Sequence, residues 1–171
     1  MTARQSFITF WLFIGALAVF HCNNNVTERY SGTTSACGGF KAFSKRASST
    51  PSFKIDSASY SEAERLWWQY DPARDYLSLL HTRIILNCDA KLSITGQMDG
   101  NTVIVNETDA AKDSGGSAAC SCTFDTYLEV PDVKPGFVSV NISSKVFSID
   151  TREGTGVFVL DSLQDSASGR P

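Results

Sequence analysis

The fold is decided by residues 120–130, which read CSCTFDTYLEV and alternate between two sets of side chains. This alternation is typical of a β-strand, because successive side chains of a strand point to opposite faces. We expect an inward face that carries both cysteines and three apolar residues: Cys120, Cys122, Phe124, Leu128 and Val130. The other face is expected to point to solvent and carries Ser121, Thr123, Asp125, Tyr127 and Glu129.

Short runs of the same character, separated by turn residues, continue on both sides of this stretch. They predict strands at residues 53–56, 65–70, 76–81, 83–88, 91–98, 102–107, 137–142, 146–149 and 157–160. Asp99-Gly100 lies between two of these runs and is typical of a hairpin turn. One helical turn is predicted at residues 61–66. The pattern therefore predicts an all-β fold, an immunoglobulin-like antiparallel β-sandwich over residues 53–163, followed by a tail at residues 164–171.

Composition limits the classes of protein that this chain can belong to. It has 171 residues, of which 42% are hydrophobic and 19% are charged, enough for one domain with a buried core. The formal net charge is −3, and no stripe of basic residues is present to neutralise phosphates. Both observations argue against a nucleic-acid-binding protein.

The N-terminus has the order of an export signal. Arg4 precedes an apolar run at Phe7–Phe20, and polar residues follow it, which predicts a signal peptide at residues 1–21. Cys22 stands just beyond the apolar run and before an Asn-rich stretch, with Val19 at a suitable position of a lipobox. We therefore expect Cys22 to be the acylated first residue of a bacterial envelope lipoprotein, bound to the membrane through its lipid anchor.

Residues 22–52 are rich in Ser, Thr, Gly and Asn and are expected to form a tether and N-terminal segment. Two alternatives to lipid anchoring remain at this stage. Cleavage after Ala16-Leu17-Ala18 would release a soluble secreted chain, and an uncleaved apolar run would act as a membrane anchor.

A family resemblance covers a little under half of the chain, from about Trp67 to Ile142. It rests on YD at residues 70–71, HTRIILNC at 81–88, DGNTV at 99–103, ET at 107–108, CSCTFD at 120–125 and KPGF at 134–137. These motifs resemble a small β-sandwich domain of uncharacterised bacterial lipoproteins. The resemblance implies the sandwich fold and the lipid anchor, but it implies no chemistry.

The cysteines suggest disulfide bonds. With Cys22 acylated, four of the five cysteines remain, and a bond between Cys120 and Cys122 would close a strained loop. We expect Cys88 to pair with one of these two and Cys37 with the other, each bond stabilising by about 2–4 kcal/mol. We also expect Cys88→Ala to cost more stability than Cys37→Ala, because the Cys37 bond ties down only the N-terminal segment.

An alternative interpretation is a metal-binding protein. His81, Cys88, Cys120 and Cys122 together offer an imidazole and three thiolates, a donor set suited to zinc or copper. The sequence contains no Gly-x-Ser-x-Gly elbow, no phosphate-binding glycine loop and no His-Glu-x-x-His motif. We therefore expect a protein that is not an enzyme and uses no cofactor.

Trp67 and Trp68 are the candidate ligand-binding residues. Adjacent strand residues point to opposite faces, so one indole is expected in the core and the other on the surface. The surface indole could stack on a glycan or a protein partner, unless the N-terminal segment or the loop at residues 110–119 covers it. Three Asn-x-Ser/Thr sequons, at Asn25, Asn106 and Asn141, have meaning only in a eukaryotic secretory pathway. The function expected is non-catalytic: structural, adhesive or ligand-binding.

Overall fold

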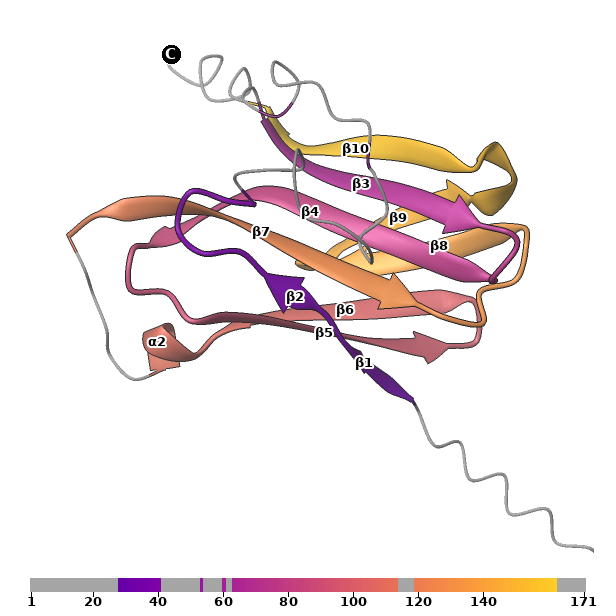
Figure 1. The fold of residues 1–171 in the computed structure, drawn as a ribbon, viewed down its shortest axis with the longest axis horizontal. Coiled ribbons are helices and arrows are strands. Elements are labelled where there is room, and N and C mark those ends of the chain that lie inside the picture. The colour runs from indigo at the N-terminus through magenta and orange to yellow at the C-terminus, as the bar shows by residue number, and fades with distance from the viewer. Residues whose placement is uncertain (1–27, 41–52, 54–59, 61–62, 114–118, 163–171) are drawn as a thin grey trace, which may run out of the picture.

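The protein is a sandwich of two five-stranded β-sheets (Figure 1). The computed structural model describes residues 28–40, 53, 60, 63–113 and 119–162; the predicted signal peptide, Cys22 and the C-terminal tail lie outside these ranges. The strands are β1 (Arg29–Ser31), β2 (Thr33–Thr34), β3 (Ala63–Asp71), β4 (Tyr76–Asn87), β5 (Leu92–Asp99), β6 (Thr102–Asp109), β7 (Ser121–Val130), β8 (Phe137–Ile142), β9 (Lys145–Asp150) and β10 (Thr155–Ser162). A helical turn, α2 (Ala110–Asp113), and a 3-10 turn, η1 (Thr151–Glu153), complete the described elements.

The strand order confirms the predicted all-β sandwich. Sheet A has the order β1-β5-β6-β8-β9, and sheet B has the order β10-β3-β4-β7-β2. Every strand pair is antiparallel except β6 and β8, which run parallel, with Thr102 opposite Ser139. This one departure from the antiparallel expectation arises because β7, which lies between them in the sequence, belongs to the other sheet. The chain thus leaves sheet A after β6 and re-enters it in the same direction.

Local predictions differ from the structure at three places. The runs at residues 76–81 and 83–88 form one strand, β4, which is interrupted by a β-bulge between His81 and Ile84. The helical turn predicted at residues 61–66 is wrong where it can be compared, because β3 begins at Ala63 and pairs there with Ser162. Of the strand predicted at residues 53–56, only Phe53 is described, and it lies outside the strands.

Two strands come from the stretch that was expected to be a tether. β1 pairs with β5 in sheet A, and β2 pairs with β7 in sheet B, so this short segment crosses from one sheet to the other. Gly32 is the crossing residue, and its amide donates to the carbonyl of Ile94 at 3.1 Å. A Cβ at this position would collide with the carbonyl of Tyr127. The crossing therefore requires glycine.

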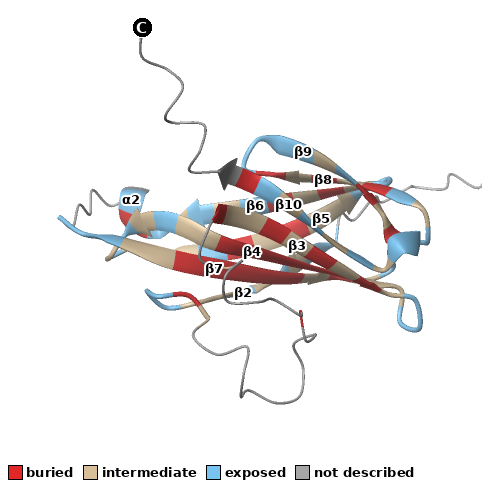
Figure 2. Ribbon diagram, turned by 90° about the horizontal axis from the view of Figure 1, so that it is seen from above, coloured by how far each residue is buried: buried red, intermediate tan, exposed pale blue. Residues whose placement is uncertain are grey.

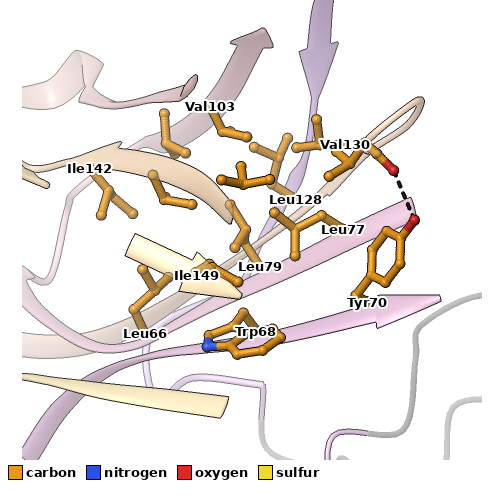
Figure 3. Packing of buried hydrophobic residues seen from close by; sticks show 14 of the residues in the cluster. Leu66, Trp68, Tyr70, Leu77, Leu79, Val103, Leu128, Val130, Ile142 and Ile149 are labelled. Atoms are coloured by element: carbon orange, nitrogen blue, oxygen red, sulfur yellow. Dashed lines mark hydrogen bonds between the residues drawn. The ribbon is translucent and has the colours of Figure 1, made fainter. Parts of the chain in front are cut away.

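The core lies between the sheets and is made of inward side chains from both (Figure 3). Leu66, Leu77, Val103 and Leu128 are fully buried, and burial is concentrated along β3, β4 and β7 (Figure 2). The hydroxyl of Tyr70 donates to the carbonyl of Val133 at 3.0 Å and so satisfies the one polar end of a core aromatic.

A second apolar cluster lies on the outer face of sheet B. Phe53, Leu80 and Tyr127 are buried there, with Phe40 and Trp67 packed against them. The expectation that Asp125 and Tyr127 face solvent is therefore wrong, since they are 0% and 7% exposed. The alternation placed them correctly on the face opposite the core, but Phe40 and Phe53, which precede β3, cover that face.

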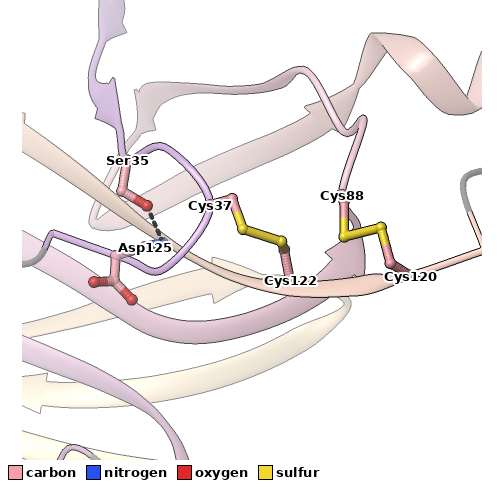
Figure 4. Close-up of a disulfide and its surroundings, with 6 residues drawn as sticks. All are labelled: Ser35, Cys37, Cys88, Cys120, Cys122 and Asp125. Atoms are coloured by element: carbon pink, nitrogen blue, oxygen red, sulfur yellow. Dashed lines mark hydrogen bonds between the residues drawn. A yellow bond between two sulfur atoms is a disulfide. The ribbon is translucent and has the colours of Figure 1, made fainter.

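Two disulfides join β7 to its neighbours (Figure 4). Cys88 pairs with Cys120, with 5.7 Å between their Cα atoms, and Cys37 pairs with Cys122 at 5.4 Å. Both pairings follow the predicted pattern. The first links the end of β4 to the start of β7, and the second fixes the N-terminal segment to β7.

With the pairing known, loop length favours the opposite order of their contributions to stability. Cys37 and Cys122 are 85 residues apart, whereas Cys88 and Cys120 are 32 residues apart. A longer closed loop removes more entropy from the unfolded chain, about 4–5 kcal/mol against about 3–4 kcal/mol in the chain-entropy model. We therefore expect Cys37→Ala/Cys122→Ala to cost about 1 kcal/mol more than Cys88→Ala/Cys120→Ala. Urea unfolding of the two double variants measures this difference, and a larger loss in the Cys88/Cys120 variant would contradict it.

Candidate functional site

Asp125 is the centre of a buried polar cluster on the outer face of sheet B. Its carboxylate accepts hydrogen bonds from the Phe40 amide at 2.8 Å, the Tyr60 hydroxyl at 2.9 and 3.1 Å, and the Arg83 amide at 3.0 Å. Its own amide donates to the Ser35 hydroxyl at 2.8 Å (Figure 4). We call this group of Asp125, Phe40, Tyr60 and Arg83 the Asp125 clamp.

Local backbone geometry builds the clamp. Arg83 has φ 65° within the bulge of β4, and its amide hydrogen bonds to Asp125. Gly39 has φ 74°, and a Cβ there would collide with both the Tyr60 hydroxyl and the Asp125 carboxylate. Burial, followed by the charge of Asp125, raises the pKa of the Tyr60 hydroxyl, so it stays protonated and donates. A buried carboxylate is stable only with such donors.

His81 is the centre of a second network, which lies inside the sandwich. Its Nδ1 is 3.0 Å from both carboxylate oxygens of Glu107, and its Nε2 is 2.8 Å from Glu64 Oε1. Glu64 comes from β3 and His81 from β4, both in sheet B, whereas Glu107 comes from β6 in sheet A. Thr126 and Ser143 also donate to Glu107, at 2.6 and 3.2 Å. The network therefore bridges the two sheets.

The charges in this network stabilise one another. Burial acts to lower the pKa of His81, but the hydrogen bonds and charges of Glu107 and Glu64 outweigh it and raise the pKa to about 9. Burial acts to raise the pKa of Glu107, but His81 and the hydroxyls of Thr126 and Ser143 lower it. Because carboxylates only accept hydrogen bonds, both ring nitrogens donate and His81 is an imidazolium ion.

The structure does not bring the four residues of the metal interpretation together as ligands. Cys88, Cys120 and Cys122 are bound in disulfides, and His81 uses both ring nitrogens on Glu64 and Glu107. The side chain of His81 is only 2% exposed. Within residues 28–40, 63–113 and 119–162, no group of three or more His, Cys, Asp or Glu side chains is arranged to hold a metal ion.

The two tryptophans divide as predicted. Trp68 is 3% exposed and lies in the core, whereas Trp67 is half-buried on the outer face of sheet B. Its Nε1 donates to the Thr82 hydroxyl at 3.3 Å, and the Arg65 guanidinium lies 5.9 Å from its ring centroid. The ring packs against the cluster of Phe53, Leu80 and Tyr127, which covers part of it.

Sequence reasoning did not identify Asp125, Glu64 or Glu107 as structural centres. A signal was present for Asp125, because it is a carboxylate in the middle of a strand, flanked by Phe124 and Tyr127. Glu64 and Glu107 lie near strand ends, where exposed carboxylates are common. Only the pairing of β3 with β4 and the packing of sheet A on sheet B bring them to His81.

Comparison with protein-family models, curated proteins and solved structures gave no match. In the part of the chain that the structure describes, no helix is long and apolar enough to cross a membrane. The function is therefore inferred from the chain's own residues.

We expect Asp125→Ala to destabilise the protein by about 2–4 kcal/mol, because several buried donors would lose their acceptor. It should also loosen Phe40 from the outer face of sheet B and make the chain after Phe40 more sensitive to limited proteolysis, while the Cys37–Cys122 disulfide still holds the preceding residues to β7. Asp89→Ala, at an exposed turn position, is the matched control and should change stability by less than about 0.5 kcal/mol. Unfolding curves and protease mapping measure both effects; equal stability of the two variants would contradict the clamp.

The His81 network predicts a dependence of stability on pH. The raised pKa of His81 stabilises the folded protein fully below pH 6.5, the pKa of a histidine in the unfolded chain. This stabilisation, about 3 kcal/mol of unfolding free energy, is lost as the pH rises through about 9. The lowered pKa of Glu107 gives a contribution that is lost as pH falls below 4.5. Urea unfolding between about pH 2 and 10 should show both limbs, and His81→Gln/Glu107→Gln should flatten the alkaline limb and reduce the acid one. An NMR titration of the imidazole in the wild-type protein is a second measurement; a neutral His81 at pH 7.5 would contradict the network.

Proposed function

We propose that this chain is a non-catalytic lipoprotein of the bacterial envelope, a disulfide-linked β-sandwich that is anchored by a lipid on Cys22 and acts by binding. The observation that carries this proposal is the distribution of the cysteines. Four of the five cysteines form two disulfides, and the one left over is Cys22. It is also the cysteine that follows the apolar run of the predicted export signal.

The disulfides support an exported location. Disulfides persist in oxidising compartments and are rare in the cytosol, where thiols are kept reduced. An odd cysteine in such a protein needs its own explanation, since a free thiol would exchange with the disulfides. Acylation of Cys22 accounts for it, and the apolar run at residues 7–20 accounts for export.

The polar networks support a binding role over catalysis. The clamp and the His81 network use their charged groups on one another, and His81 and Asp125 are 2% and 0% exposed. A catalytic acid or base has to reach a substrate, directly or through water. Both networks instead join separate segments, as expected of a scaffold that presents its surfaces.

The anchor would hold the domain close to the membrane. β1 begins at Arg29, which leaves residues 23–28 between the proposed lipid and the first strand. At about 3.5 Å per residue, six residues span at most about 20 Å. A sandwich on so short a connection would act next to the bilayer surface.

Mass spectrometry of protein purified from the membrane fraction tests the proposal. We expect a mature N-terminus at Cys22 that carries the mass of a diacylglyceryl group and a fatty acid. Cys22→Ser should abolish the added mass and release the chain from the membrane, while leaving both disulfides intact. A wild-type chain that begins at Val19 without added mass would contradict lipid anchoring.

A further inference from the structure

In the described part of the chain, three of the four strands at the sheet edges are protected against pairing with another molecule. β1 has three residues and β2 has two, and both belong to the segment that crosses between the sheets. β9 carries Lys145 at one end and Asp150 at the other. Natural proteins guard edge strands by shortness and by charge, because an open edge otherwise pairs with strands of other molecules.

β10, the fourth edge strand, has neither kind of protection and forms the upper margin of the sandwich in Figure 1. It has eight residues, and residues 155–160 read TGVFVL, without a charged side chain or a proline. Val157 and Val159 are 44% and 53% exposed. They point to the outer face of sheet B, since Val157 is opposite Trp67. Among the described residues, no strand pairs with the open edge of β10.

The hydrogen bonds between β10 and β3 show which backbone groups face the open edge. The Tyr70 amide donates to the Gly154 carbonyl at 2.7 Å, and this bond sets the phase of the antiparallel ladder. In such a ladder, alternate residues hydrogen bond to the neighbouring strand, and the residues between them turn their N–H and C=O groups the other way. The N–H and C=O groups of Thr155, Val157 and Val159 therefore point to the open edge.

The open edge is bounded on both sides and is symmetric about Val157. On one side, the chain turns through η1 before it reaches β10. On the other side, a register shift follows Val159, and the Lys145 ammonium donates to the Leu160 carbonyl at 2.6 Å. The regular stretch with outward backbone groups is therefore residues 155–159, and Val157 is its middle residue.

We propose that β10 pairs with β10 of a second copy of this chain, antiparallel and about a two-fold axis at Val157. This pairing places Val157 opposite Val157 of the other copy, and Thr155 opposite Val159 of the other copy. Each outward N–H of one copy then meets an outward C=O of the other, and the two copies of sheet B form one continuous sheet. The inference goes beyond the function proposed above and does not depend on the lipid.

The side chains at this edge favour a copy of the same strand as the occupant. Pairing a strand with itself brings identical side chains together at the axis, so charged residues there would repel one another. Residues 155–160 contain none, and pairing would bring the exposed Val157 and Val159 of both copies into contact. The nearest cation, Arg65 on β3, is directed to the ring of Trp67, 5.9 Å from its centroid.

The inner side of the edge is already closed. Phe158 of β10 packs against Phe147 of β9, with 4.8 Å between their ring centroids. Pairing therefore needs no opening of the core. A contact over one short strand buries less surface than a standard interface of about 1,600 Å², so we expect a dissociation constant of about 100 µM. The lipid proposed for Cys22 would raise the effective concentration of the chain on a membrane, but the dimer does not require it.

Sedimentation of the mature chain tests this proposal. Residues 22–171 with Cys22→Ser are exported to a bacterial periplasm behind a cleavable signal, so that both disulfides form and no lipid is attached. We expect a monomer at about 10 µM and mostly dimer at about 1 mM, because association depends on concentration.

Amide exchange over the same concentrations locates the contact. Exchange should slow with rising concentration at Thr155, Val157 and Val159, whose amides face the open edge of β10. The amides of Val146 and Ser148 on β9 should exchange at the same rate throughout.

Matched variants test the edge and its register. Val157→Lys should raise the dissociation constant by about tenfold or more, because like charges then meet at the axis. Val146→Lys changes the same residue type on β9, at 68% exposure, and should leave the dimer unchanged. Thr155→Lys/Val159→Lys places like charges opposite each other and should abolish the dimer, whereas Thr155→Glu/Val159→Lys places opposite charges there and should retain it.

Four results would overturn the proposal: a monomer at every concentration, a dimer that Val157→Lys leaves intact, equal loss in the Val146→Lys control, or slow exchange at Val157 and Val159 that does not depend on concentration. The last result would assign the edge to a segment of the same chain. The outcome is separable from that of the anchoring experiment, because this chain carries no lipid. A wild-type chain without acyl mass contradicts anchoring alone, and a monomer in this assay contradicts the dimer alone.

Discussion

A single buried carboxylate, that of Asp125, fixes how Phe40 and Tyr60 lie against the outer face of sheet B. Asp125 lies at 0% exposure on a face that would otherwise be solvated, and it is tolerable there only because donors from three separate segments reach it. Those donors fix the position of Phe40 and Tyr60 and the bulge of β4. Phe40 in turn helps to cover Leu80 and Tyr127. Removing Asp125 would therefore disturb three features at once: the apolar outer face of sheet B, the bulge and the N-terminal cover.

The His81 network lies between the two sheets, whereas the clamp lies on the outer face of sheet B. Glu107 is the only member of its three-residue charge group that belongs to sheet A, so the imidazolium holds the two sheets together at one end of the core. Buried ion groups contribute less to stability than well-packed apolar residues of the same size, but they specify geometry. Here the hydrogen bonds of one ring to two carboxylates connect β3 and β4 of sheet B to β6 of sheet A.

The fold was largely predictable because it depends on the alternation of apolar and polar side chains along each strand, which can be read directly from the sequence. The strand at residues 121–130 follows from a period of two, which also places Cys88 on a face that meets Cys120 and Cys122; the choice of Cys120 came from the structure. The covered face was not predictable, because alternation says which residues share a face and not what lies over it. β1 and β2 were missed for a related reason: a Ser- and Thr-rich stretch pairs through its backbone, whose hydrogen bonds leave little trace in side-chain pattern. The roles of Glu64 and Glu107 were not predictable because they depend on how β3 pairs with β4 and on how the two sheets pack against each other.

The crossing of the N-terminal segment has a consequence for biogenesis. In a chain that is delivered through a membrane N-terminus first, Cys37 emerges 85 residues ahead of its partner, and Cys88 emerges between them. Among the four cysteines that form disulfides, Cys37 and Cys88 are the first to reach an oxidant, and they are not a native pair. β1 and β2 likewise wait for β5 and β7, which are made later. The N-terminal residues would therefore find their native partners only after later parts of the chain have emerged. A disulfide isomerase, which reshuffles early wrong bonds by thiol exchange, would assist this step.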